Sequence, residues 1–210
     1  VLAVFPADHY IKDIKKFQGC VNRALKCAGS DFLVTIGIKP NKPAAGYGYI
    51  KIKSKVKSKK SKLNYLEVDK FLEKPSLDKA KEYARSRDYF WNSGMFIWKV
   101  SVFRDELAKY MPELYSQLKS VQTKDDIEKV WGKIKPISVD YGIMEHSKKI
   151  ALVPADFYWS DLGSWDALEE LLRKDKNGNV LSGNSLDCDS QGLCAFSRGN
   201  RLIATIGLKD

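Results

Sequence analysis

A strand–helix–strand pattern at the start of the chain constrains the fold more than any other feature of the sequence. Val1–Phe5 is an apolar run typical of a buried central strand. Asp13–Ala28 carries apolar residues at helical spacing, and Gly29 follows them as a stop signal. Phe32–Ile38 is a second apolar run, which we expect to lie parallel to the first. The pattern therefore predicts an α/β fold.

The elements after this unit are less regular. We expect a hairpin between Tyr47 and Phe71, and Ser76 is a good N-cap for a helix over Leu77–Ser86. Ser164 is expected to cap a later helix, Trp165–Arg173. Between them the pattern predicts a strand at Met95–Trp98, helices at Val102–Tyr110, Lys124–Lys135 and Asp140–Ser147, and a strand at Ile150–Pro154.

The character of the sequence changes after residue 174. Asp175–Asn179 is a strong turn signal, and short strands are expected beyond it at Val180–Leu186, Leu193–Ser197 and Leu202–Ile206. We therefore predict two domains, 1–174 with the α/β pattern and 175–210 rich in strands.

The net charge of +10 is concentrated in one stretch, Lys51–Lys62, which contains seven lysines. Lysines first alternate with Ile52 and Val56 and then continue alone, which favours an edge hairpin with a solvated loop. No aromatic residue lies between these lysines, so stacking on bases is not indicated and nucleic acid is not expected as a partner. A basic protein that binds polyanions through this stretch remains an alternative.

The four cysteines, Cys20, Cys27, Cys188 and Cys194, form no C-x-x-C pair, and the two histidines complete no zinc spacing. No apolar run approaches the length needed to cross a membrane, so no membrane partner is expected. A reduced, cytoplasmic protein is the simplest interpretation of this composition.

Two short motifs indicate a ligand site. Asn92-Ser93-Gly94-Met95-Phe96 and the segment from Trp159 to Trp165 (Trp-Ser-Asp-Leu-Gly-Ser-Trp) each combine aromatic rings, small turn residues and single polar groups. Turns of this composition can hold one polar group against a ligand while the rings shape the wall around it. A purely structural turn is the alternative for either motif alone.

Four further motifs occur in order along the chain: Pro6-Ala7-Asp8-His9, Gly46-Tyr47-Gly48-Tyr49-Ile50, Phe71-Leu72-Glu73-Lys74-Pro75, and the segment Ser138–Glu145. The whole series resembles the mannose-1-phosphate guanylyltransferases, which make GDP-mannose from mannose 1-phosphate and GTP and release diphosphate. The resemblance implies a Rossmann-like nucleotidyltransferase fold with a mixed, mostly parallel sheet, followed by the start of a small β-helix-like domain. It also implies a cytoplasmic homo-oligomer when complete.

One expected motif is missing from the sequence. The family resembled carries a loop of the form Gly-Gly-x-Gly-x-Arg-Leu, whose backbone N–H groups hold the triphosphate. This chain contains no such loop. We therefore expect a fragment without its nucleotide-binding segment, which is inactive alone.

The resemblance implies a metal pair. Asp8 and Asp161 are expected to hold Mg2+ and to be catalytic together with Lys74. From the residues alone, Asp8 could equally cap the helix that follows it, and Asp161 could form an Asx-turn. His9 is expected to be structural or a neighbour of the sugar.

The resemblance also implies a sugar-phosphate site. Glu73 is expected to accept hydrogen bonds from sugar hydroxyls, and Lys74 is expected to neutralise the phosphate. The other expected substrate-binding residues are Gly46, Tyr47, Gly48, Asn92, Ser93 and Gly94. A solvated Glu73–Lys74 ion pair is the alternative, and Asp140, Tyr141 and Glu145 either line the site or support it.

Three alternative functions remain from the sequence. The chain could be an inactive fragment that only binds sugar phosphate, or a relative that transfers a nucleotide to glucose 1-phosphate. The third, a polyanion-binding protein, depends on the lysine stretch alone. The two motifs at residues 92–96 and 159–165 favour mannose.

Overall fold

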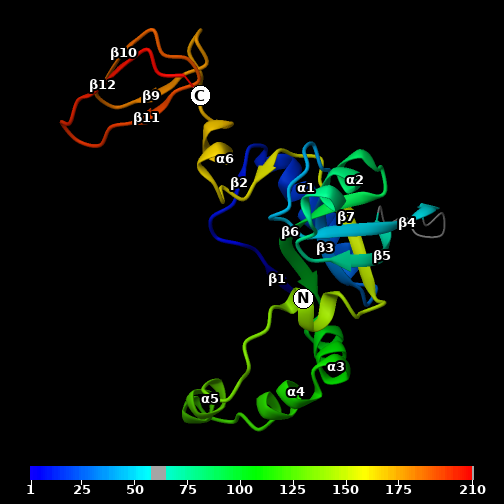
Figure 1. Ribbon diagram of the computed structural model, residues 1–210. Coiled ribbons are helices and arrows are strands. Elements are labelled where there is room, and N and C mark those ends of the chain that lie inside the picture. Colours follow the sequence, from blue (N-terminus) through cyan, green and yellow to red (C-terminus); the bar gives the residue numbers. More distant parts are fainter. Residues whose placement is uncertain (58–64, 210) are drawn as a thin grey trace. The chain divides into compact units, whose positions relative to one another are not determined.

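The computed structural model describes residues 1–57 and 65–209, and they divide into two compact units (Figure 1). The sheet unit consists of Val1–Ala7 and Ile11–Trp159. The C-terminal unit consists of Asp8–Tyr10 and Ser160–Asp210. This division differs from the predicted domain boundary at residue 174 by the segment 160–174, and the predicted boundary stays a prediction.

A six-stranded mixed sheet forms the centre of the sheet unit, in the order β1-β6-β3-β7-β5-β4. Only β3 and β7 pair in parallel among its described strands, and the other neighbours are antiparallel. The prediction of a mostly parallel sheet is therefore wrong. Its strands are β1 (Leu2–Val4), β3 (Leu33–Ile38), β4 (Tyr49–Lys57), β5 (Leu66–Leu72), β6 (Tyr89–Trp98) and β7 (Ile150–Pro154).

The middle of the chain explains the antiparallel pairings. β4 and β5 form the predicted hairpin, and a hairpin necessarily returns antiparallel. The helix α2 (Leu77–Arg85) then leads into β6, which lies antiparallel to both β3 and β4. Because β6 separates β1 from β3, the first strand and the third run in the same direction without being neighbours.

The first strand is not buried as predicted. Among the described strands, β1 pairs only with β6 and lies at the edge of the sheet, where Leu2 and Val4 are 45% and 42% exposed. The expectation of a buried central strand at residues 1–5 is therefore wrong. An apolar run shows that a segment favours a strand, but the number of its neighbours depends on β6, which lies far along the chain.

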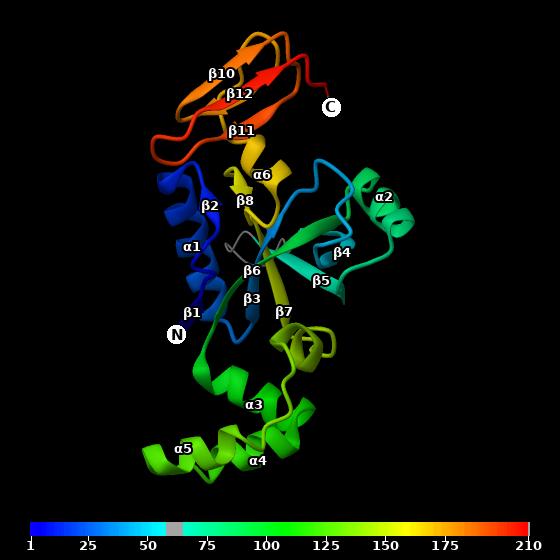
Figure 2. The same ribbon diagram turned by 60° about the vertical axis from the view of Figure 1, so that its left-hand side comes forward.

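The helix α1 (Ile14–Ala28) was predicted almost to the residue, and it covers one face of the sheet (Figure 2). It begins at Asp13, whose side chain accepts a hydrogen bond from the backbone N–H of Lys16 at 3.0 Å. Its buried face contains Cys20 and Cys27, and burial raises the pKa of the Cys20 thiol to about 11. Both thiols therefore behave as small apolar groups in the core.

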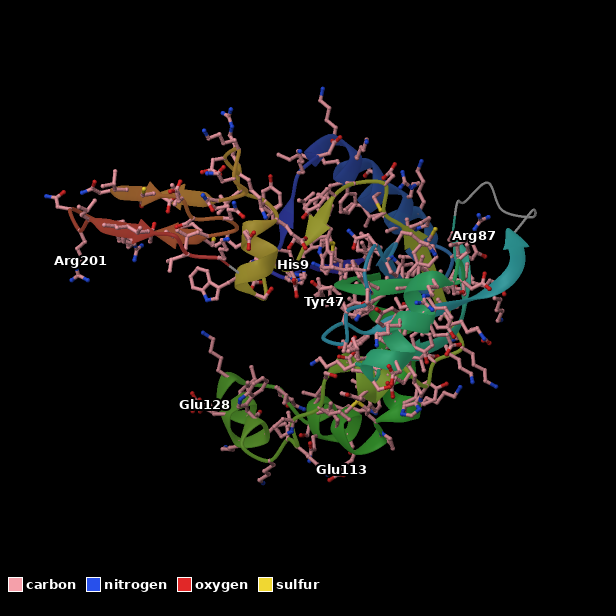
Figure 3. All side chains as sticks on the ribbon, turned by 45° about the horizontal axis from the view of Figure 1, so that its top comes forward. His9, Tyr47, Arg87, Glu113, Glu128 and Arg201 are labelled. Atoms are coloured by element: carbon pink, nitrogen blue, oxygen red, sulfur yellow. The ribbon has the colours of Figure 1, made fainter. Side chains whose placement is uncertain are left out.

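A helical extension follows β6: α3 (Val100–Tyr110), α4 (Pro112–Lys119), α5 (Lys124–Trp131) and the π-helix η1 (Asp140–Met144). The helix α4 was not predicted from the sequence, although Pro112 stands in its first turn, a position that proline favours. Thr123 and Asp126 form a capping box at the start of α5. That helix ends at Trp131, four residues before the predicted end. Figure 3 labels Glu113 and Glu128 on this extension.

The C-terminal unit contains α6 (Trp165–Glu169) and four short strands that pair in parallel, β9 with β11 and β10 with β12. Ser164 caps α6 as predicted, because its Oγ accepts a hydrogen bond from the N–H of Ala167 at 3.1 Å. The helix ends at Glu169 rather than Arg173. The strands are β9 (Val180–Ser182), β10 (Ser185–Cys188), β11 (Cys194–Phe196) and β12 (Ile203–Ile206); separately, β2 (Tyr10–Ile11) pairs with β8 (Trp159–Ser160).

Candidate functional site

A bulge in β6 shapes the motif at residues 92–96. Thr35 pairs with Phe96 and Gly37 pairs with Asn92, so three residues of β6 lie opposite the single residue Ile36. The Ser93 hydroxyl donates to the carbonyl oxygen of Ile36 at 2.6 Å, which satisfies a group that the bulge takes out of the regular ladder. The next residue is Gly94, whose φ of 70° favours glycine.

The bulge fixes the Asn92 side chain. Its Oδ1 accepts a hydrogen bond from the N–H of Gly94 at 3.1 Å and one from the hydroxyl of Thr35 at 3.4 Å. Its Nδ2 donates to Oδ1 of Asp140 at 3.0 Å. A backbone N–H can only donate, so the atom that faces Gly94 must be the amide oxygen. This settles which side of the amide faces Asp140.

Glu73 and Asn92 border the same glycine. A Cβ atom built on Gly48 would lie 2.5 Å from Oε2 of Glu73 and 3.4 Å from Cβ of Asn92. The backbone N–H of Asn92 also donates to the carbonyl oxygen of Gly48 at 2.8 Å. The fold therefore brings three predicted sugar-binding residues together from separate segments of the chain.

Three carboxylates and one ammonium group surround this point. Glu145 accepts a hydrogen bond from the backbone N–H of Glu73 at 3.3 Å, and the ammonium of Lys74 lies 3.7 Å from Oε1 of Glu73. Burial, and then the charge of Asp140, raise the pKa of Glu73 above its ordinary value. Burial likewise raises the pKa of Asp140, against the opposing hydrogen bond from Asn92. The site therefore holds its negative charges at a cost in stability.

Lys74 has an unusual backbone. Its φ is 40°, in the left-handed region, although it is not a glycine and Pro75 follows it. The Lys74 side chain is 64% exposed, whereas that of Glu73 is only 12% exposed. The turn thus leaves the ammonium accessible beside a nearly buried carboxylate, and strain of this kind is frequent at binding sites.

The other predicted sugar-site residues lie differently. The Tyr47 ring packs edge-on against Trp91 and Trp159, with centroids 5.0 and 5.5 Å away, in the core cluster that faces α1. Alternation along β6 places Asn92 on the face opposite Trp91. Figure 3 shows Tyr47 and Arg87 toward opposite ends of the sheet. A Cβ atom on Gly46 would meet nothing within 4 Å. Roles for Gly46, Tyr47 and the buried Ser93 in sugar binding stay predictions.

Thr35 and Asp140 both hydrogen-bond to the Asn92 amide, and neither contact was predicted from the sequence. Thr35 is fully buried within the run Leu33–Ile38. A single hydroxyl in an otherwise apolar strand is the signal that could have drawn attention to it, because a buried hydroxyl needs a hydrogen-bond partner. Asp140 gave no comparable signal, since its partner depends on how η1 packs.

The predicted metal residues lie near each other in the C-terminal unit, around His9. Burial lowers the pKa of His9 below its ordinary value, while the charges of Asp8 and Asp161 both act in the opposite direction. Both carboxylates therefore lie close enough to His9 to affect its charge. Figure 3 shows His9 and, at the far end of the β11–β12 loop, Arg201. Asp8 is not the N-cap of α1, since Asp13 has that role.

Asp161 occupies a tight turn, as its motif predicted. Its Oδ1 accepts a hydrogen bond from the N–H of Gly163 at 3.2 Å, and Ser160 Oγ accepts one from the N–H of Leu162. Leu162 has a φ of 53°, so this turn is also strained. The Asx-turn alternative is thus observed at Asp161.

A divalent cation suits these two carboxylates in kind. Magnesium is typically held by one or two carboxylates together with phosphate oxygens and water. No group of three or more His, Cys, Asp or Glu side chains in residues 1–57 and 65–209 is arranged to hold a metal. Any metal at Asp8 and Asp161 would therefore take its remaining ligands from the substrate and solvent.

The chain matches a known protein family. The family model described as nucleotidyl transferase covers residues 1–178. The chain belongs to the nucleotidyl transferase family. A mannose-1-phosphate guanylyltransferase from Escherichia coli is 34% identical over all of this chain, which corresponds to 47% of that protein. The resemblance stated from the motifs is confirmed, and the chain spans about half the length of the curated relatives it matches.

Two solved structures are similar to this chain in fold. A protein from Thermus thermophilus, described as a mannose-1-phosphate geranyltransferase, superposes with a TM-score of 0.85 at 30% identity. The match covers 99% of this chain and 60% of that one. A mannose-6-phosphate isomerase from Helicobacter pylori gives 0.63 at 31% identity, over 76% of this chain and 63% of that one.

The lysine stretch offers less free charge than its composition suggests. Lys51 lies 3.6 Å from Asp69, and Lys53 lies 3.2 Å from Glu67 on the partner strand. Residues 58–62 of the stretch lie outside the described residues. In the part of the chain that is described, no helix is long and apolar enough to cross a membrane.

Proposed function

We propose that this chain carries the sugar-phosphate site and the metal-binding carboxylates of a mannose-1-phosphate guanylyltransferase. The convergence of Glu73, Lys74 and Asn92 around Gly48 is the observation that supports this most strongly. With Gly48, these residues come from three separate segments, and each segment matches a motif of that family. The names of the relatives support the same assignment.

Each residue of the cluster has a chemical role in this proposal. Glu73 accepts hydrogen bonds from sugar hydroxyls, since a carboxylate has several acceptor positions. Lys74 neutralises the sugar phosphate with an exposed ammonium group. Gly48 leaves the space that the Glu73 carboxylate occupies. Asn92 orients the sugar through its amide.

Asp8 and Asp161 would hold Mg2+ in this proposal. The cation, when bound, would neutralise charge that develops on the phosphoryl oxygens. His9 has a lowered pKa and is therefore neutral near pH 7, so it adds no positive charge beside the metal. Asp161 would offer its carboxylate to the cation from the turn that its hydrogen bond with the N–H of Gly163 closes.

The proposed reaction joins mannose 1-phosphate to GTP. An oxygen of the sugar phosphate attacks the α-phosphorus of GTP, the bond from that phosphorus to the bridging oxygen breaks, and diphosphate leaves with the electron pair. Positioning and charge neutralisation account for the catalysis, and no covalent enzyme intermediate is required. The residues assigned here serve the sugar phosphate and the metal.

Finer features of the family belong to the same proposal. The parallel pairings β9–β11 and β10–β12 are those expected of the first coils of a β-helix. A cytoplasmic location agrees with four cysteines that form no disulfide. Homo-oligomerisation is proposed from the resemblance alone.

A glucose-specific relative is the second candidate, and the same experiment tests both. Mannose 1-phosphate and glucose 1-phosphate differ only in the orientation of one hydroxyl. Isothermal titration of the protein with each sugar phosphate, with Mg2+ present, should show binding of mannose 1-phosphate that Glu73→Gln weakens. Tighter binding of glucose 1-phosphate would support the second candidate, and an equal affinity of the parent and Glu73→Gln would overturn the placement of the site.

A further inference from the structure

The Asn92 amide has fewer free positions than its chemistry alone suggests. An asparagine side chain offers two acceptor lone pairs and two donor hydrogens. Gly94 and Thr35 donate to its oxygen, and Asp140 accepts one of its hydrogens. Among the residues that the structure describes, Nδ2 of Asn92 forms no second hydrogen bond. One N–H of the amide is therefore left for a ligand.

Asp140 determines which of the two Asn92 amide hydrogens stays available to a ligand, because it accepts the other one. The two bonds to Oδ1 come from β3 and from the bulge itself, so they form whenever the sheet forms. Asp140 instead comes from η1, 48 residues further along the chain than Asn92. Its carboxylate is partly buried, and a hydrogen bond to a charged group in such a place is among the stronger ones.

We propose that Asp140 is a positioning residue, whose carboxylate holds the Asn92 amide so that Asn92 donates one hydrogen bond to an acceptor oxygen of the bound sugar. The proposal rests on the proposed function for the identity of the ligand. It assigns Asn92 the role of a donor only, because both lone pairs of its oxygen are occupied within the protein. A ligand group that can only donate would find no partner at this residue.

The substitutions separate the hydrogen bond from the space that Asp140 fills. Asp140→Asn keeps an acceptor oxygen that can face Nδ2 of Asn92, whereas Asp140→Ala removes it. Asn92→Ala removes the group on which Asp140 is argued to act. If Asp140→Ala does not fold, Asp140→Leu fills the space without accepting a hydrogen bond and takes its place.

The first measurement needs no ligand. In the 15N–1H spectrum of the chain, the Asn92 side-chain amide is assigned as the pair of signals that Asn92→Ala removes. We expect the hydrogen of this pair that faces Asp140 to exchange slowly with solvent in the parent and in Asp140→Asn, and at least about tenfold faster in Asp140→Ala. Equal exchange in all three would overturn the proposal, whether or not mannose 1-phosphate binds.

The second measurement is a double-mutant cycle with mannose 1-phosphate. Asp140→Ala should weaken binding about tenfold in the parent background, and should have no further effect in Asn92→Ala, because its target is absent there. An equal loss in both backgrounds would show that Asp140 acts independently of Asn92 and would overturn the proposal. A parent protein that binds no mannose 1-phosphate while its amide stays protected would count against the proposed function only, and the exchange data would then decide the role of Asp140.

Discussion

Gly48→Ala is the sharpest test of the sugar site, because one methyl group should displace one carboxylate. The added Cβ would lie 2.5 Å from Oε2 of Glu73, whereas an ordinary contact is 3.4 Å or more, so the oxygen must retreat by about 0.9 Å. Gly48 has no positive φ, so its backbone accepts alanine. The change therefore acts on the position of Glu73.

The expected loss is in affinity and not in stability. Hydrogen bonds to a charged group contribute about 1.5–3 kcal/mol, so misplacing the carboxylate should weaken mannose 1-phosphate roughly ten- to a hundredfold. The displaced atom is the end of a flexible side chain, so moving it costs little. Alanine also lowers the entropy of the unfolded chain, which stabilises the fold by about 0.4–1 kcal/mol. The melting temperature should therefore change by only about 3 °C.

Gly46→Ala is the matched variant, two residues away in the same loop. A Cβ atom there meets nothing within 4 Å, so it should cost little affinity. Calorimetric titration of both variants, with melting curves, measures the difference. If Gly48→Ala binds the sugar phosphate as tightly as the parent, Glu73 is not the residue that hydrogen-bonds to the sugar. If both variants lose affinity alike, the loop backbone and not Glu73 forms the contact.

Three further predictions concern single charges. Asp161→Asn keeps an oxygen for the N–H of Gly163, so its free energy of unfolding should stay within about 0.5 kcal/mol. In an enzyme that also carries the triphosphate loop, the same change should lower metal-dependent turnover by orders of magnitude. A large drop in melting temperature would make Asp161 a turn former only. Glu73 has a raised pKa, so its charge destabilises the folded state increasingly as the pH rises through that pKa. Glu73→Gln should therefore have a higher melting temperature than the parent at pH 7. This difference in melting temperature should vanish below pH 4.5, the ordinary pKa of the side chain. Lys74 has a left-handed backbone, which glycine adopts without strain and alanine does not, so Lys74→Gly should be more stable than Lys74→Ala by about 1 kcal/mol in denaturant titrations. Both variants lack the ammonium group and should lose affinity for the sugar phosphate equally. Unequal affinities would show that the turn, and not the charge, binds the phosphate.

The lysine stretch supplies the last prediction. Replacing Lys51 and Lys53 with glutamine should leave mannose 1-phosphate binding within about twofold of the parent, since both ammonium groups already have carboxylate partners on the neighbouring strand. Titration of the double variant measures this. A tenfold loss would move the phosphate site from Lys74 to the hairpin.

The sequence predicted those features that depend on neighbours along the chain. α1 and β7 were placed nearly to the residue because a helical or apolar period of that length leaves little choice. The place of β1 in the sheet could not be predicted, since the strand beside it is β6, and the order of strands depends on tertiary contacts. α4 is short and its apolar pattern is weak, so a local period does not reveal it.

The candidate site divides in the same way. Glu73, Lys74 and Asn92 were predicted as site residues because each stands in a recognisable motif, and the fold places them near one another. Thr35 stands in no such motif, and Asp140 stands in one that does not point to Asn92 as its partner. Their hydrogen bonds join segments that lie 57 and 48 residues from Asn92. A group that acts by holding another is visible only in three dimensions.

The bulge in β6 has a consequence for which sequence changes the chain can tolerate. It places two more residues on β6 than on β3, an even number, so the alternation of inward and outward faces has the same parity before and after it. Phe90 and Phe96 accordingly lie in one core cluster, and Trp91 and Ile97 in the other. Loss of one residue from the bulge would exchange the faces of everything that follows in the strand, whereas loss of Ser93 and Gly94 together would leave a regular strand without a site. Insertions and deletions at this point should therefore survive in pairs, which makes the proposed binding feature removable without disrupting the sheet that carries it.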